Sequence, residues 1–125
     1  MPIDLKLSLL VLAGSALGGL ARFWLGAWSV VLWGPDFPWG TLLINVLGSF
    51  VIGAAATAFP VDAAGPRALV MVGLCGGFTT FSAYSLQSLE LLQADRVTAA
   101  FGYMASSVAA CLAATALGWA LGRLA

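Results

Sequence analysis

The chain has 125 residues, of which 62% are hydrophobic and only 8% are charged. Five Lys and Arg residues balance five Asp and Glu residues, there is no His, and the mean hydropathy is +1.03. A water-soluble domain carries about a quarter charged residues, so this composition excludes a soluble enzyme, a nucleic-acid-binding protein and a disordered tail. The apolar runs are continuous and lack the alternation of barrel strands, which indicates an all-α integral membrane protein.

Four apolar stretches are each long enough to cross a bilayer, for which about 20 residues suffice. They leave little room for loops, so we expect one four-helix transmembrane domain over residues 1–125. The predicted spans are residues 7–33, 39–59, 67–93 and 97–121. Short breaker sequences separate them: Gly34–Asp36, a loop with a proline at each end (Pro60 and Pro66), and Asp95–Arg96.

Positive charges mark the two membrane sides only weakly. Lys6, Arg67 and Arg123 lie on the side of both termini, and Arg96 lies on the other side. Because the distribution of Lys and Arg sets orientation, so small a bias predicts insertion in both orientations. A single orientation set by the slight excess is the alternative.

Small residues recur at a spacing of four in two of the spans. Gly14 and Gly18 share one face of the first span, and Gly118 and Gly122 share one face of the fourth. This spacing allows helix backbones to approach closely in lipid. It predicts packing rather than a particular function.

Arg22 is a charged residue in the middle of the first span, where burial in lipid is costly. It can line an aqueous vestibule that attracts an anion, or extend along the apolar surface to the interface. Spans one, two and four contain no carboxylate, and Glu90 lies near the end of span three. The charges within the spans therefore favour anions over cations.

The third span contains a sequence that is unfavourable for a continuous helix. Adjacent glycines, Gly76 and Gly77, precede the β-branched pair Thr79 and Thr80. A break at this depth frees backbone carbonyls, which is tolerated only where protein, water or an ion satisfies them. The sequence predicts a helix broken in mid-membrane, with a simple kink as the alternative.

Two further spans carry polar residues. Asn45, in the second span, offers amide donors and an acceptor, either to a pore or to a neighbouring helix. The fourth span carries a stripe with a spacing of four, consisting of Tyr103, Ser107, Cys111 and Thr115. Its hydroxyl groups can face a pore or bond carbonyls of their own helix.

Three motifs together resemble the Fluc (CrcB) family of fluoride ion channels. They are residues 18–23 (GGLARF), residues 40–45 (GTLLIN) followed by 48–50 (GSF), and residues 76–82 (GGFTTFS). The resemblance covers essentially the whole chain. It implies a lipid-embedded, multi-pass protein of the cell inner (plasma) membrane that is not an enzyme. It further implies an antiparallel, dual-topology homodimer with two fluoride pores and one central sodium ion.

The resemblance also implies roles for individual positions. Gly76 and Thr79 match the residues whose backbone carbonyls bind sodium, and Arg22 and Thr41 match vestibule positions. The implied fluoride pore consists of Asn45, Phe81, Ser82, Tyr84, Tyr103, Ser107, Cys111 and Thr115.

Three positions depart from the family pattern. Tyr84 replaces a second pore phenylalanine, Ala83 stands where threonine is usual, and Gln87 occupies a common glutamate position. These changes bear on the rate of conduction and on fine selectivity more than on the identity of the family.

The chemistry of the residues agrees with anion conduction. Fluoride is tightly hydrated, and amide and hydroxyl donors or electropositive ring edges can replace its water. No carboxylate or His is placed to couple transport to protons, which favours a passive channel. The alternatives are a small dual-topology multidrug transporter, which needs an embedded carboxylate in its first span, and a membrane assembly subunit without transport.

Overall fold

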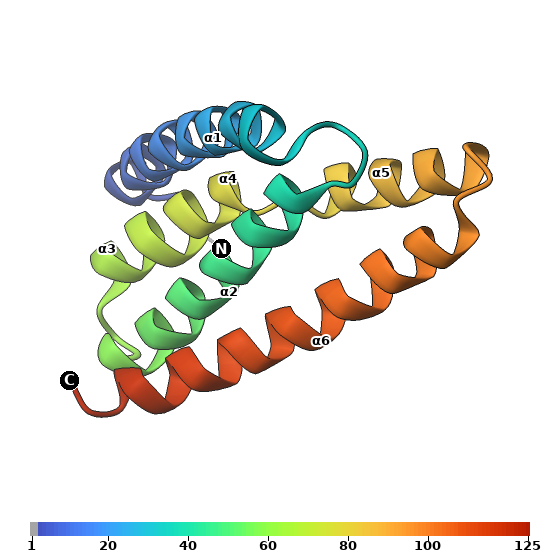
Figure 1. Cartoon of the computed structure of the whole chain (residues 1–125). Coiled ribbons are helices and arrows are strands. Elements are labelled where there is room, and N and C mark those ends of the chain that lie inside the picture. Colours follow the sequence, from blue (N-terminus) through green and yellow to red (C-terminus); the bar gives the residue numbers. More distant parts are fainter. Residues whose placement is uncertain (1–2) are drawn as a thin grey trace.

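The computed structural model describes residues 3–125, and helices are the only regular elements in that range (Figure 1). Four helical stretches are long and apolar enough to cross a membrane. The first, second and fourth are the single helices α1 (Leu5–Trp33), α2 (Trp39–Ala58) and α6 (Val97–Gly122). The third consists of α3 (Ala64–Arg67), η1 (Ala68–Cys75), α4 (Gly76–Phe78) and α5 (Phe81–Gln93). The structure thus confirms the all-α class with four helical spans.

The third span is broken, as the glycine and threonine pairs predicted. Thr79 and Thr80 have extended backbone conformations, with ψ angles of 159° and 119°, so α4 ends and α5 begins on either side of them. Just before this point, η1 is a π-helix, a form that occurs at functional sites. We refer to Thr79–Thr80 as the break.

One boundary of the third span differs from the prediction. The helix begins at Ala64 rather than at residue 67, so Pro66 lies in its first turn and not in the loop. The first-turn N–H groups of a helix have no partner within the helix, and proline therefore sacrifices no hydrogen bond there. Pro66, which the sequence placed at the end of the loop, therefore lies inside the helix.

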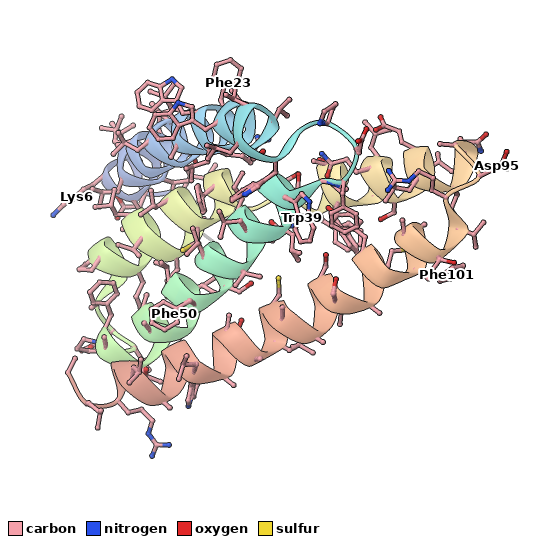
Figure 2. All side chains as sticks on the ribbon, in the orientation of Figure 1. Lys6, Phe23, Trp39, Phe50, Asp95 and Phe101 are labelled. Carbon is pink, nitrogen blue, oxygen red and sulfur yellow. The ribbon has the colours of Figure 1, made fainter. Side chains whose placement is uncertain are left out.

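The spans form a bundle in which α2 packs between α6 and the first half of the third span (Figure 1). On the other side of that half, α1 packs against η1 and α4, whereas α5 packs against α6. The loop after α1 and the turn between α5 and α6 lie at one end of the bundle. Lys6 and Asp95 mark the two opposite ends (Figure 2).

Glycines permit these close contacts. A Cβ at Gly18 would overlap the carbonyl oxygen of Leu74, and a Cβ at Gly77 would lie only 2.6 Å from the carbonyl oxygen of Ser15. In the same way, a Cβ at Gly118 would overlap the carbonyl oxygen of Phe50. The glycine spacing therefore allows α1 to approach the third span and α6 to approach α2 at backbone distance.

Apolar side chains cover the outside of the bundle (Figure 2). Phe23 is 70% exposed and Leu112 is 67% exposed, although both lie inside apolar spans. Exposing so much apolar surface to water is unfavourable, whereas contact of that surface with lipid tails or with a second subunit is not. The outer surface of the bundle is therefore suited to contact with lipid or with another apolar protein surface.

Arginines stabilise both ends of the bundle. Nη1 of Arg67 donates to the carbonyl oxygens of Ala56 and Phe59, at 3.3 and 3.1 Å, and so satisfies acceptors at the end of α2. At the opposite end, Nη1 of Arg96 donates to the carbonyl oxygen of Asp36, which joins the two connections. Both arginines thus act on carbonyl groups that helix ends and loops leave free.

Candidate functional site

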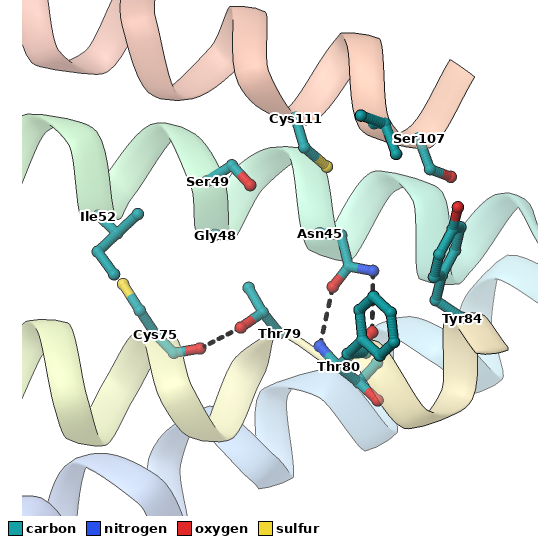
Figure 3. A pocket seen from close by; sticks show the side chains of 12 residues that line it. Asn45, Gly48, Ser49, Ile52, Cys75, Thr79, Thr80, Tyr84, Ser107 and Cys111 are labelled. Atoms are coloured by element: carbon teal, nitrogen blue, oxygen red, sulfur yellow. Dashed lines mark hydrogen bonds between the residues drawn. The ribbon is translucent and has the colours of Figure 1, made fainter. Parts of the chain in front are cut away.

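An open cavity of about 300 Å³ lies beside the break and is lined by residues of α2, η1, α5 and α6 and by the break itself (Figure 3). We call it the break cavity. Its polar lining consists of neutral amide, hydroxyl and thiol groups, and no charged residue lines it. The lining residues are Asn45, Gly48, Ser49, Ile52, Cys75, Thr79, Thr80, Phe81, Tyr84, Ser107, Val108 and Cys111.

Asn45 makes two hydrogen bonds to the backbone of the break (Figure 3). Its Nδ2 donates to the carbonyl oxygen of Thr80 at 3.1 Å, and the N–H of Thr80 donates to its Oδ1 at 2.9 Å. The amide thus pairs with Thr80 as a neighbouring β-strand would. One hydrogen on Nδ2 is left for another acceptor in the cavity.

These contacts divert the N–H groups that would continue the helix. In an unbroken helix the N–H of Thr80 would bond the carbonyl of Gly76, and the N–H of Ala83 would bond the carbonyl of Thr79. Instead the first donates to Asn45, and the second donates at 3.0 Å to Oγ1 of Thr80, the N-cap of α5. The break therefore leaves Gly76 and Thr79, the two predicted cation ligands, without their helical donors.

Cys75 receives the bonds that end α4. Both the N–H and the Oγ1 hydroxyl of Thr79 donate to the carbonyl oxygen of Cys75, at 2.9 and 2.7 Å. The hydroxyl of Thr79 is therefore occupied, and its carbonyl is the group that remains for a ligand. Ser82, a predicted pore residue, is exposed beside the break, with its hydroxyl 3.3 Å from Oγ1 of Thr80.

Two aromatic rings follow the break on one side of α5. Phe81 is 79% exposed, and its ring centroid lies 5.5 Å from that of Tyr84. The hydroxyl of Tyr84 donates to the carbonyl oxygen of Met104 at 3.0 Å. This bond fixes the ring against α6. Because it uses the hydroxyl hydrogen of Tyr84, that hydrogen is not available to donate to an ion.

The predicted stripe on α6 separates into different environments. Ser107 is buried, lines the break cavity, and has no hydrogen-bond partner for its hydroxyl, and Cys111 lines the same cavity. Tyr103 is fully buried behind the ring of Tyr84 and donates to Oε1 of Gln87 at 3.1 Å.

Thr115, the last residue of the stripe, lies outside the lining of the break cavity. Its hydroxyl donates to the carbonyl oxygen of Cys111 in its own helix, at 2.9 Å. Threonine in a helix commonly makes this bond. Of the predicted pore residues, Thr115, Ser82 and Tyr103 therefore do not line the break cavity.

A second, more polar cavity of about 480 Å³ lies at the end of the bundle that carries Asp95. We call it the end cavity, and its lining includes Thr41, Gln87 and Glu90. Gln87 thus contacts this cavity and also accepts from Tyr103, which packs against Tyr84 at the break cavity. Gln87 and Tyr103 lie between the two cavities.

Arg22 lines neither cavity. Its Nε donates to the carbonyl oxygen of Gly77, at 3.3 Å, in the last turn before the break. The sequence predicted this side chain at an aqueous vestibule or at the membrane interface and did not predict this contact. Backbone acceptors carry no sequence signal, although Gly14, Gly18 and Arg22 share a spacing of four that places them on one face of α1.

Ser49 and Thr80 were also missed as lining residues of the break cavity. Ser49 lies one turn after Asn45 on α2, so the spacing of four along that helix was an available signal. Thr80 was noted only as part of the helix-breaking pair, but its backbone and hydroxyl organise the break.

Any cation at the break would depend on backbone oxygens. Among residues 3–125 no cluster of three or more His, Cys, Asp or Glu side chains is placed to hold a metal. The carbonyls of Gly76 and Thr79 are hard oxygen ligands, which suit an alkali or alkaline-earth cation better than a soft transition metal. The donor set at the break therefore fits sodium in chemical type.

The chain has clear relatives among known proteins. Residues 9–119 match the family model described as CrcB-like protein, Camphor Resistance (CrcB). A protein named fluoride-specific ion channel FluC from Methylocella silvestris is 49% identical over 113 residues, which cover 86% of each chain. Proteins of the same name are 47% identical in Methylobacterium radiotolerans (88% of this chain, 80% of the relative) and 42% identical in Rhizobium etli (93% and 95%).

The family-model match includes the break and every residue that lines the break cavity. The four apolar helical spans agree with the lipid-embedded, multi-pass protein that the resemblance to this family implies. On this combined evidence from sequence and fold, the chain belongs to the CrcB family.

Proposed function

We propose that this protein is a passive, fluoride-selective ion channel, which exports fluoride across the inner membrane and so relieves fluoride toxicity. It crosses that membrane four times and is not an enzyme. One observation carries the proposal: the break cavity has neutral hydrogen-bond donors, and the buried Ser107 hydroxyl on its wall has no partner. A buried donor without a partner is costly, and an anion in the cavity would satisfy it. The relatives named as fluoride-specific channels support the same ion.

The cavity supplies the groups that a small anion needs on losing its water. The second Nδ2 hydrogen of Asn45 and the hydroxyl of Ser107 are donors, and the edges of Phe81 and Tyr84 are electropositive. Selectivity then follows from the narrowness of the path and from the placement of these donors.

The multidrug-transporter alternative requires an embedded acid. No carboxylate lines the break cavity, and Glu90 lines the end cavity instead. If the protein were an assembly subunit without transport, no transported ion would be available as a partner for the buried Ser107 hydroxyl.

A flux experiment tests the proposal. Purified protein in fluoride-loaded liposomes should release fluoride to an external electrode once a potassium ionophore removes the charge barrier. Chloride-loaded liposomes serve as the matched control and should release little. Proton uptake driven by a cationic drug, without fluoride release, would support the multidrug alternative and overturn the proposal.

We also propose that the working unit is an antiparallel homodimer in lipid. Phe81 is 79% exposed at mid-membrane, and an added Cβ at Gly76 or Gly102 would meet nothing within 4 Å in the protomer. These features suit a surface that a second copy covers, and the weak charge bias suits insertion in both orientations.

Accessibility of Lys6 tests the dual topology. A membrane-impermeant amine reagent applied to sealed vesicles should label about half of the Lys6 side chains, and the rest only after permeabilisation. Arg123→Lys, at the same end of the chain, provides a second reporter that should behave identically. Complete labelling, or complete protection, before permeabilisation would contradict an antiparallel pair.

Sodium at the dimer centre is the proposed cofactor. The carbonyl oxygens of Gly76 and Thr79, two per subunit, would hold it and give four hard ligands without charged side chains. When bound, sodium would supply positive charge that fixes the two broken spans against each other. The role is structural.

Substitutions at the two positions should differ in effect. Thr79→Ser retains the carbonyl and the hydroxyl bond to Cys75, so flux and dimer stability should change less than about twofold. Gly76→Leu has space within the protomer and should fold, but it should prevent dimerisation or flux by filling the surface between subunits. Size-exclusion chromatography with light scattering measures the dimer. A dimeric, conducting Gly76→Leu protein would refute this arrangement.

A further inference from the structure

The hydrogen bonds around the break divide its carbonyl groups into two sets. Oxygens of Cys75, Gly77 and Thr80 accept bonds from Thr79, Arg22 and Asn45, respectively. The oxygens of Gly76, Phe78 and Thr79 lose their helical donors. Thr80 N–H and Ala83 N–H bond elsewhere, and the extended break separates Ser82 N–H from the oxygen of Phe78. Side chains that reach the break thus satisfy some of its oxygens and hold away the N–H groups that would return to Gly76 and Thr79.

Two of these side chains come from other helices. Arg22 belongs to α1 and acts from one side of the third span, whereas Asn45 belongs to α2. We infer that Arg22 and Asn45 are positioning residues that together hold the break open, so that the carbonyl oxygens of Gly76 and Thr79 face a ligand. The inference rests on the proposed function for the identity of that ligand, sodium.

Arg22 is suited to this role by its position on α1. Gly18, one turn earlier on the same face, lies so close to the third span that an added Cβ would be 2.8 Å from the backbone nitrogen of Phe78. Such contact fixes α1 relative to α4 and brings Nε of Arg22 to the carbonyl of Gly77. In a continuous helix that carbonyl would accept from Phe81 N–H, so Arg22 replaces the bond that the break removes.

Asn45 does the complementary work at Thr80. Its amide bonds both the backbone N–H and the carbonyl oxygen of Thr80, so the N–H of Thr80 keeps a partner although its helical acceptor is lost. Without Asn45, Thr80 N–H would be free to return to the carbonyl of Gly76 and straighten the span. That change would remove one free oxygen from the proposed sodium site.

The shape of the break can be measured directly with spin labels. Val72 on η1 and Leu86 on α5 are both exposed and lie on either side of the break, so cysteines there can carry nitroxides. The measurement uses the full chain with Cys75 and Cys111 changed to Ala, diluted with unlabelled protein so that distances within one protomer dominate.

Arg22→Lys, Arg22→Gln and Asn45→Leu should each shift or broaden the distance distribution. Arg67→Gln is the matched control, because Arg67 also bonds carbonyl oxygens but at the end of α2. The spin-label distance distribution of the Arg67→Gln protein should equal that of the parent. If the three variants also match the parent, Arg22 and Asn45 do not hold the break, and the inference is wrong.

Sodium dependence separates this inference from the proposed cofactor. The melting temperature of the parent should rise with sodium at constant ionic strength, and Arg22→Lys should need roughly tenfold more sodium for half the effect, as the loss of one charge-assisted hydrogen bond predicts. If the parent shows no sodium effect, the proposed sodium site fails, while the label distances still decide the role of Arg22 and Asn45.

Fluoride flux distinguishes positioning from electrostatic attraction by Arg22. Lys preserves the charge but cannot place a donor at Nε, so positioning predicts that Arg22→Lys loses as much flux as Arg22→Gln at every ionic strength. A vestibule charge, as the sequence suggested, predicts that Arg22→Lys conducts normally and that Arg22→Gln is slow mainly at low salt. That second result would overturn the inference for Arg22.

Discussion

Phe81→Ile should reduce fluoride efflux by about two orders of magnitude while leaving the dimer folded, a loss equivalent to roughly 2.7 kcal/mol in barrier height. The ring is 79% exposed, so its removal sacrifices little packing within the protomer. Isoleucine keeps an apolar side chain of similar size but lacks an aromatic edge with partial positive charge. Efflux from liposomes and the elution volume of the purified dimer are the two measurements.

Tyr84 provides the comparison for this prediction. Tyr84→Phe keeps the ring and loses only the bond to the carbonyl of Met104, so it should conduct at an altered rate. Tyr84→Ile removes the ring and should be much slower. If both isoleucine variants, at 81 and at 84, conduct as well as the parent, the rings are packing residues and the proposed ion contacts are wrong.

Gly18→Ala should lower the free energy of unfolding by about 3 kcal/mol, at the upper end of the usual cost of overpacking. The added methyl group overlaps the carbonyl oxygen of Leu74 in the third span, and a backbone atom cannot move aside as a flexible side chain can. The displacement would also carry Arg22 away from Gly77, so fluoride flux should fall together with stability.

The neighbouring glycine is a matched control. A Cβ at Gly19 would meet nothing within 4 Å, and alanine favours a helix over glycine by about 1 kcal/mol. Gly19→Ala should therefore be neutral or slightly stabilising when both variants are melted in the same detergent. Equal melting temperatures for the two variants would contradict the close packing of α1 on the third span.

Large features of the fold could be predicted because they depend on local composition. Lipid requires long apolar helices, and Gly76–Gly77 followed by Thr79–Thr80 is unfavourable for a helix in any protein. The observed helices and the break agree with these expectations. The close approach of α1 at Gly18 follows from the same kind of local rule.

The partners of the polar side chains could not be predicted in the same way. Arg22 and Asn45 bond backbone atoms 55 and 35 residues away, and backbone groups look alike in every sequence. Whether a hydroxyl faces a cavity or its own helix depends on small rotations of α6, which left Ser107 at the cavity and Thr115 bonded to Cys111. Tertiary packing therefore determines which of these hydroxyl groups reaches the cavity.

The reversal potential of the current in a planar bilayer tests passive fluoride conduction most directly. With a fluoride gradient across the membrane, the potential at zero current should shift by about 59 mV per tenfold gradient, as expected for a monovalent ion. A superimposed pH gradient should leave that potential unchanged, because no carboxylate or His lines the break cavity. A reversal potential that follows the pH gradient, or one that is insensitive to fluoride, would contradict a passive fluoride channel.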